Sequence, residues 1–224
     1  MEPRGLLLDL DDTLYAFAPV EARARAAIYA EISRDLSLPE TRAKELYEAA
    51  RSRVMERLGT RASAHSRLLF LHELVASVGA PLVLARKWER TFWGTSLTAM
   101  TPYPEARPLL EAWRAAGNRT AIVTDLMLSI QFDKLDRLGL LDLVDAVIAS
   151  EEVPWDKPAP EIFELAWTRL GVPRERCVMV GDNDARDGEG ARALGIPFLH
   201  VRGSDRDAPG MPLSEVVRAL GLHT

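Results

Sequence analysis

The stretch LLLDLDDTL, residues 6–14, places three carboxylates directly behind a run of leucines. The preceding GLLL, residues 5–8, is a continuous apolar run, which is typical of a strand buried on both faces of a parallel sheet. Asp9, Asp11 and Asp12 repel one another, so their proximity costs free energy unless a cation, a proton or water compensates the charge. The stretch therefore predicts either a solvated acidic turn or a site that binds a cation.

Helices and strands alternate along the second half of the chain. We expect helices over 105–116, 129–138, 160–170, 187–194 and 213–220, and strands over 120–124, 144–150, 177–181 and 196–201. This alternation predicts an α/β fold with a doubly wound, Rossmann-like parallel sheet, in which ligands bind beyond the carboxyl ends of the strands. The strand at 5–8 must belong to the same sheet, so the segment between it and the second strand is an insertion.

The insertion has helical periodicity throughout. Four amphipathic helices are expected, over 19–36, 39–59, 65–79 and 81–97, and four such helices form a compact bundle. The predicted domains are an α/β core of residues 1–15 and 101–224 and an all-α domain of residues 16–100. Within the latter, Trp88, Phe92 and Trp93 are expected to form its core or a subunit contact. His65 and Arg67 are expected on a solvated helix face, with an orientation toward the active site as the alternative.

Composition narrows the possible partners. The net charge of −5 gives no electrostatic footprint for nucleic acid. No stretch approaches the roughly 20 apolar residues that span a bilayer, and the N-terminus lacks a signal-peptide pattern. The single cysteine, Cys177, lies in an apolar run, which predicts a core position in a reducing compartment. We expect a cytoplasmic monomer or homodimer that binds neither nucleic acid nor membrane.

Polar side chains follow each of the first four strands, at the same edge of the predicted sheet. In chain order they are Asp9 and Asp11, then Thr124 and Asp125, then Lys157, and finally Asp182 and Asp187. The aspartates are the oxygen ligands that Mg²⁺ prefers, while Thr124 offers a hydroxyl donor and Lys157 a positive charge. This set suits phosphoryl transfer, in which one carboxylate attacks phosphorus and a second acts as general acid and base.

Four ordered motifs make the chain similar to a known family. They are LLLDLDDTL (a DxDxT pattern), AIVTD at 121–125, the lysine of DKPAPEIF at 156–163, and VMVGDNDARDGEGARALG at 178–195 (a GDxxxxD pattern). With these motifs the chain resembles the haloacid dehalogenase-like hydrolase superfamily, on its phosphatase branch. A lone DxDxT would be weak, whereas four motifs in order, each at a strand end, are specific.

The resemblance implies a role for each motif residue. Asp9 would be the nucleophile and a metal ligand, and Asp11 would be the general acid and base while giving the metal its backbone carbonyl. Thr124, Asp125 and Lys157 would bind the substrate, with Thr124 on the transferring phosphoryl group and Lys157 paired with both phosphate and nucleophile. Asp182 would ligate Mg²⁺, with Asp187 beside it or acting through water. The helical insertion would be the cap that closes over the site and chooses the substrate.

The expected activity is that of a Mg²⁺-dependent phosphatase acting on a small phosphorylated metabolite through an aspartyl-phosphate. A nucleoside monophosphate, a sugar phosphate and phosphoglycolate are all open as substrates. Dehalogenases and phosphonate-cleaving relatives lack an aspartate at the position of Asp11, so this residue favours phosphate ester hydrolysis. The alternatives are a phosphosugar mutase, which keeps this aspartate, and a non-catalytic binding or regulatory protein. Asp12 is expected to be structural, with its side chain pointing away.

Overall fold

The chain divides into two compact units in a computed structural model that describes residues 4–204 and 207–222. One unit comprises Met1–Phe17 and Met100–Thr224, and the other is Ala18–Ala99, where the sequence predicts the insertion at 16–100. The first unit carries the sheet and all four motifs, and the second is helical. Each unit is described by itself.

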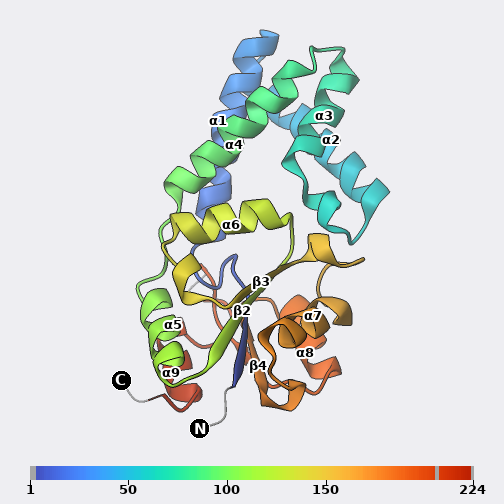
Figure 1. Ribbon diagram of the computed structural model, residues 1–224. Helices are drawn as coiled ribbons and strands as arrows, with labels where there is room; N and C mark the ends of the chain where they lie inside the picture. The colour runs from blue at the N-terminus through green and yellow to red at the C-terminus, as the bar shows by residue number, and fades with distance from the viewer. Residues whose placement is uncertain (1–3, 205–206, 223–224) are drawn as a thin grey trace. The chain divides into compact units, whose positions relative to one another are not determined.

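A five-stranded parallel sheet forms the centre of the first unit (Figure 1). Its strands are β1 (Gly5–Leu8), β2 (Arg119–Thr124), β3 (Ala146–Ala149), β4 (Cys177–Gly181) and β5 (Phe198–His200), in the order β3-β2-β1-β4-β5. Strand β1 lies in the middle, where Leu8 pairs with Ile122 of β2 on one side and with Val180 of β4 on the other. All four residues of β1 are buried, as the apolar run predicts.

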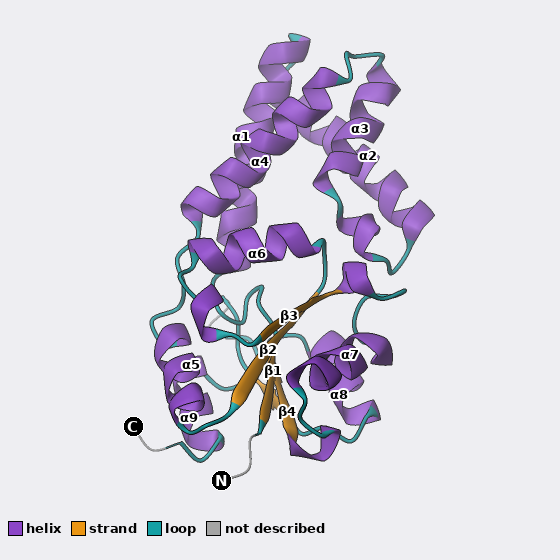
Figure 2. Cartoon of the chain, viewed as in Figure 1, coloured by secondary structure: helices purple, strands orange, loops and turns teal. Residues whose placement is uncertain are grey.

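Helices cover both faces of this sheet. They are α5 (Ala106–Ala115), α6 (Leu128–Arg137), α7 (Pro160–Leu170), α8 (Glu189–Ala193) and α9 (Leu213–Ala219), with short turns η2 (Leu141–Leu143), η3 (Ser150–Glu152) and η4 (Arg174–Arg176). Figure 2 shows α5 and α9 on one face and α7 and α8 on the other. Leu7, Val123 and Met179 pack with Phe163 of α7 in one buried cluster, so the alternate residues of each strand face the opposite layer. The predicted α/β fold with a doubly wound parallel sheet is confirmed.

The helix predicted over 187–194 begins earlier than expected. A π-helical turn, η5 (Asp184–Gly188), precedes α8, and the Asn183 side chain caps it by accepting a hydrogen bond from the Arg186 amide at 3.1 Å. Because the side chain of an asparagine can satisfy the first amides of a turn, the chain starts to coil directly after Asn183. This early turn places Asp187 inside the coil.

The second unit contains four long helices. They are α1 (Phe17–Leu36, whose first residue belongs to the first unit), α2 (Glu40–Leu58), α3 (Arg67–Val78) and α4 (Val83–Ala99), with a short η1 (Ala62–His65) before α3. Tyr47 lies at the centre of its core, with edge-to-face contacts to Tyr29 at 5.7 Å and Phe70 at 6.1 Å between ring centroids. Such aromatic pairs stabilise a core beyond the area that they bury.

Arg67 is buried rather than solvated, so the expectation for this residue was wrong. Its guanidinium is paired with Glu21 at 3.0 Å and lies over the rings of Phe92 and Trp93, at 5.1 and 5.6 Å from the centroids. The ion pair and the ring faces compensate the charge in the interior. Trp88 and Phe92 are also buried, so the aromatic cluster forms the core of this unit.

No helix among residues 4–204 and 207–222 combines the length and apolar character that a membrane span requires.

Candidate active site

The motif residues meet at the carboxyl ends of three neighbouring strands. Asp9 follows β1, Thr124 ends β2 and Asp182 follows β4, and β1 lies between β2 and β4. Loops at this end of a parallel sheet converge, which is why ligands bind there in doubly wound folds. Lys157 reaches the same place from the loop before α7, and Asp187 reaches it from η5.

A buried lysine holds two buried carboxylates at the centre of the site. The Nζ atom of Lys157 donates to Asp9 Oδ1 at 2.6 Å, to Asp187 Oδ1 at 2.7 Å and to the Val123 carbonyl oxygen at 2.9 Å. Lys157, Asp9 and Asp187 are 5%, 6% and 0% exposed. Since charges at such depth need partners, the three side chains depend on one another.

One lysine does not offset all the negative charge here. Burial raises the pKa of Asp9 to about 6, with Lys157 opposing the rise and Asp182 and Asp11 adding to it. Burial likewise raises the pKa of Asp187 to about 7, and that of Asp182 to about 6. Burial lowers the pKa of Lys157, but Asp187 and Asp9 outweigh it and hold that pKa above its ordinary value. A cluster with excess negative charge is typical of a functional site that takes a cation.

Three carboxylates lie close enough together to hold a metal ion. Asp9, Asp182 and Asp187 each offer one oxygen, and these atoms lie within 4.8 Å of one another. Carboxylate oxygens are the ligands of hard cations such as Mg²⁺, so the donor set fits the predicted metal. The carboxylate of Asp11 is not part of this set.

The threonine of the DxDxT pattern joins the first and fourth motifs. The Thr13 hydroxyl donates to Asp9 Oδ2 at 3.0 Å and accepts a hydrogen bond from the Asp182 amide at 3.1 Å. Both oxygens of Asp9 are thus held, Oδ1 by Lys157 and Oδ2 by Thr13. The protein's own side chains therefore fix the orientation of the Asp9 carboxylate.

Gly181 makes room for Asp187. A Cβ atom at residue 181 would lie 2.2 Å from Asp187 Oδ2 and 2.5 Å from its Cγ. No side chain fits at that distance, so the glycine of the GDxxxxD pattern is required by the aspartate that ends it.

Two residues that sequence reasoning missed, Gln131 and Arg186, form hydrogen bonds with the second motif. The Gln131 side chain of α6 donates to the Thr124 hydroxyl at 2.7 Å and to the Asp125 carbonyl at 2.6 Å. The Asp125 carboxylate accepts from the Lys157 amide at 3.0 Å and from Arg186 at 2.9 Å. This carboxylate joins the loops after β2, β3 and β4, and a substrate-binding role for Asp125 stays a prediction.

Lys134 and Tyr15, also missed from the sequence, surround Asp11. The Lys134 ammonium donates to both oxygens of Asp11, at 2.7 and 2.8 Å, and the Tyr15 hydroxyl donates to Oδ1 at 2.6 Å. Burial, reinforced by Asp11, raises the pKa of Tyr15, which keeps its hydroxyl proton in place. Lysine is scarce in this chain, with Lys44, Lys87, Lys134 and Lys157 the only four. That scarcity was the one feature of the sequence that could have drawn attention to Lys134.

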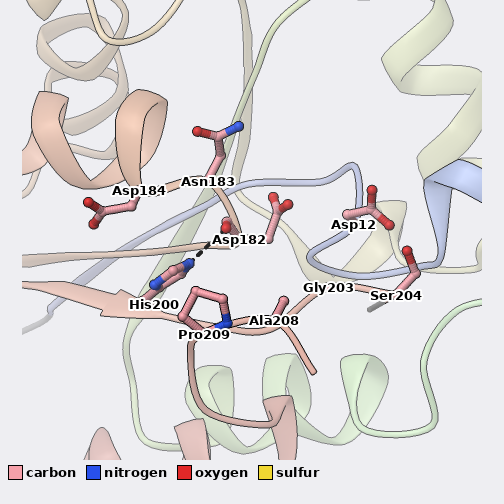
Figure 3. Close-up of a pocket in the computed structure, with 9 residues that line it drawn as sticks. All are labelled: Asp12, Asp182, Asn183, Asp184, His200, Gly203, Ser204, Ala208 and Pro209. Carbon is pink, nitrogen blue, oxygen red and sulfur yellow. Dashed lines mark hydrogen bonds between the residues drawn. The ribbon is translucent and has the colours of Figure 1, made fainter. Parts of the chain in front are cut away.

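A hollow of about 360 Å³ reaches Asp182 from the side of β5, and residues lining it include Asp12, Asn183 and His200 (Figure 3). His200 Nε2 donates to the Asp182 carbonyl at 2.8 Å. Asp12 Oδ1 accepts from the Phe17 amide at the start of α1, at 3.0 Å. Asp12 therefore caps a helix, which is the structural role expected of it.

Comparisons with known proteins agree with this geometry. The chain is 36% identical over 200 residues to a ribulose-1,5-bisphosphate 5-phosphatase of Halopiger xanaduensis, covering 86% of this chain and 82% of that protein. It is 33% identical to a glyceraldehyde 3-phosphate phosphatase of Methanopyrus kandleri, with 89% and 84% covered. The crystal structure of a HAD phosphatase from Thermococcus onnurineus superposes with a TM-score of 0.75 at 27% identity, covering 98% of this chain and 99% of that one.

A family model described as haloacid dehalogenase-like hydrolase matches residues 3–195. This range includes all four motifs and nearly the whole described chain. The match agrees with the parallel sheet and with the cluster of Asp9, Asp182 and Asp187 beyond its carboxyl ends. The chain therefore belongs to the haloacid dehalogenase-like hydrolase family.

Proposed function

We propose that the chain is a phosphoric monoester hydrolase that cleaves a small phosphorylated metabolite through an aspartyl-phosphate on Asp9. The observation that carries this proposal is the orientation of the Asp9 carboxylate, held by Lys157 at 2.6 Å and by Thr13 at 3.0 Å beside two further carboxylates. A nucleophile fixed in this way loses little freedom when it attacks.

The reaction has two displacements. In the first, an oxygen of Asp9 attacks phosphorus, the phosphorus–oxygen ester bond breaks, and Asp11 gives a proton to the leaving oxygen, which departs as an alcohol. In the second, Asp11 takes a proton from water while the water oxygen attacks phosphorus, which releases inorganic phosphate and restores Asp9. Lys157 offsets the charge on the phosphoryl oxygens, and the Thr124 hydroxyl holds one of them.

Mg²⁺ fits the site. Asp9, Asp182 and Asp187 would hold it with their carboxylates, and Asp11 with its backbone carbonyl. When bound, the ion reduces the repulsion between an anionic nucleophile and an anionic phosphate. The raised pKa values of the three carboxylates support this assignment, because a cation would favour their ionised forms.

A small phosphorylated compound is the substrate class that the relatives support. Relatives with phosphatase names act on ribulose 1,5-bisphosphate, glyceraldehyde 3-phosphate and phosphoserine. Sugar phosphates, nucleoside monophosphates and phosphoglycolate are the compounds to test in this chain. The helical unit Ala18–Ala99 is the proposed cap that selects among them. We place the enzyme in the cytoplasm, as a monomer or homodimer without nucleic-acid or membrane partners.

The test is a phosphoester screen of the purified protein with Mg²⁺ and with a chelator. We expect phosphate release from at least one small phosphoester, and loss of that release when the metal is chelated. Isomer formation without phosphate release would identify a mutase. If no phosphoester of a broad panel released phosphate, the result would support a binding protein. Activity that survives chelation would contradict the metal assignment.

A further inference from the structure

Lys134 is a buried cation whose position the four motifs do not explain. Its side chain is 1% exposed, whereas that of its partner Asp11 is 30% exposed. The ammonium lies at 2.7 and 2.8 Å from the two oxygens of Asp11, and 5.8 Å from the centre of the Phe17 ring. A surface salt bridge leaves both side chains mobile, but a lysine buried to this extent has few alternative rotamers.

Among the residues that the structure describes, three hydrogen bonds hold the Asp11 carboxylate, and they are distributed unevenly between its oxygens. Oδ1 accepts from Tyr15 at 2.6 Å and from Lys134, while Oδ2 accepts from Lys134. A carboxylate oxygen has two lone pairs, so this network occupies both on Oδ1 and one on Oδ2. The second lone pair of Oδ2 is the one that the network leaves for a proton.

Gln131, Lys134 and Leu135 form one buried face of α6. Gln131 holds the Thr124 hydroxyl, and Lys134 holds Asp11. One helix therefore sets both the residue proposed to bind the phosphoryl group and the residue proposed to handle the proton. A rigid element gives more precise placement than a loop does.

We propose that Lys134, together with Tyr15, is a positioning residue that orients Asp11 so that its Oδ2 exchanges the proton with the leaving oxygen and with water. This inference rests on the proposed function, because it assumes that Asp11 is the general acid and base. Lys134 does not touch the substrate; it acts through Asp11.

The test compares two leaving groups in the variant Lys134→Met. The ratio kcat/KM reports the first displacement, which needs the proton for an alkyl phosphate but hardly needs it for p-nitrophenyl phosphate, whose leaving group is a stable anion. General acid catalysis contributes about 100- to 10,000-fold, so losing the orientation of Asp11 should lower kcat/KM about 30-fold for the alkyl ester and at most about threefold for the aryl ester. An equal loss with both esters, or no loss, would overturn the proposal.

A double-mutant cycle asks whether Lys134 acts through Asp11. In an Asp11→Asn background the proton donor is already absent, so adding Lys134→Met should change kcat/KM for p-nitrophenyl phosphate by less than about twofold. Tyr15→Phe should reproduce the leaving-group pattern of Lys134→Met more weakly. The matched control is Lys44→Met, which removes one positive charge from an exposed position in α2. It should leave kcat/KM unchanged for both the alkyl and the aryl ester.

The pairing is also measurable without turnover, which separates this inference from the proposed function. Thermal unfolding of wild type, Lys134→Met, Asp11→Asn and the double variant gives the coupling between the two side chains. We expect the double variant to be no less stable than Lys134→Met alone, because the unpaired carboxylate is then gone. Fully additive losses would refute the pairing, whereas a wild type that pairs normally but releases no phosphate would refute only the proposed function.

Discussion

Replacing Lys157 by methionine should destabilise the metal-free protein strongly at pH 8 and weakly at pH 6. Burial places the pKa of Asp9 at about 6 and that of Asp187 at about 7, both above the value near 4 expected in the unfolded chain. Folding therefore disfavours their ionised forms, and the metal-free protein gains stability as the pH falls through 7 and 6. Lys157 opposes this penalty from 2.6 and 2.7 Å.

The size of the effect follows from the protons that the variant must take up. Without Lys157 both carboxylates must be neutral in the folded protein. At pH 8 the solution is about two pH units above the pKa of Asp9 and about one unit above that of Asp187, so each carboxylate must take up its proton against that difference. At about 1.4 kcal/mol per unit, the loss approaches 4 kcal/mol at pH 8 and falls below about 1 kcal/mol at pH 6. The value at pH 8, where both carboxylates would otherwise be ionised, agrees with the cost of about 3–5 kcal/mol for breaking a buried ion pair.

Urea unfolding of chelator-treated wild type and Lys157→Met at the two pH values measures this difference. The matched control is Lys87→Met, whose ammonium pairs with Asp35 at 2.7 Å but is 45% exposed. Because that ion pair is exposed to solvent, the loss of stability in Lys87→Met should be small and equal at both pH values. A loss in Lys157→Met that is the same at pH 6 and pH 8 would refute the electrostatic reasoning and assign Lys157 a packing role.

Three further predictions concern the carboxylate cluster. Asp9→Asn should lower phosphate release at least about 10,000-fold while the far-ultraviolet circular dichroism is unchanged; near-normal release would exclude Asp9 as the nucleophile. Saturating Mg²⁺ should raise the Tm by about 5–10 °C at pH 8, and by progressively less as the pH falls through 7 and 6. The reason is that the pKa of Asp187 is about 7 and that of Asp9 about 6, and protonated carboxyls bind the ion poorly. A Tm shift that does not depend on pH would contradict the assignment of this cluster as the metal site. Gly181→Ala should cost about 1–3 kcal/mol and weaken Mg²⁺ binding in calorimetry, because its Cβ would lie 2.2 Å from Asp187 Oδ2. The matched control for this variant is Gly94→Ala, where the new Cβ would meet no other part of the described chain within 4 Å apart from its neighbours in the helix. It should stabilise α4 by about 0.5–1 kcal/mol and leave Mg²⁺ binding unchanged.

Two of the four lysines show where sequence reasoning succeeds and where it stops. Lys157 lies in a loop directly after a strand, and parallel strands deliver such loops to one edge of the sheet, so its meeting with Asp9 was predictable from order alone. Lys134 lies within a helix, where amphipathic periodicity assigns a charged residue to the solvent. It is buried instead, because its partner Asp11 comes from a strand end 123 residues away.

The sequence by itself determined the fold class and the identity of the motif residues. A run of leucines followed by aspartates, and helices alternating with strands, are local patterns that hold whatever the strand order is. Only the tertiary structure decided which side chains interact. It brings carboxylate oxygens of Asp9, Asp182 and Asp187 within 4.8 Å of one another, whereas the Asp11 carboxylate accepts a hydrogen bond from Lys134. The physical reason is that a buried charge is stabilised by whichever partner the packing brings near, and packing joins residues that are distant along the chain.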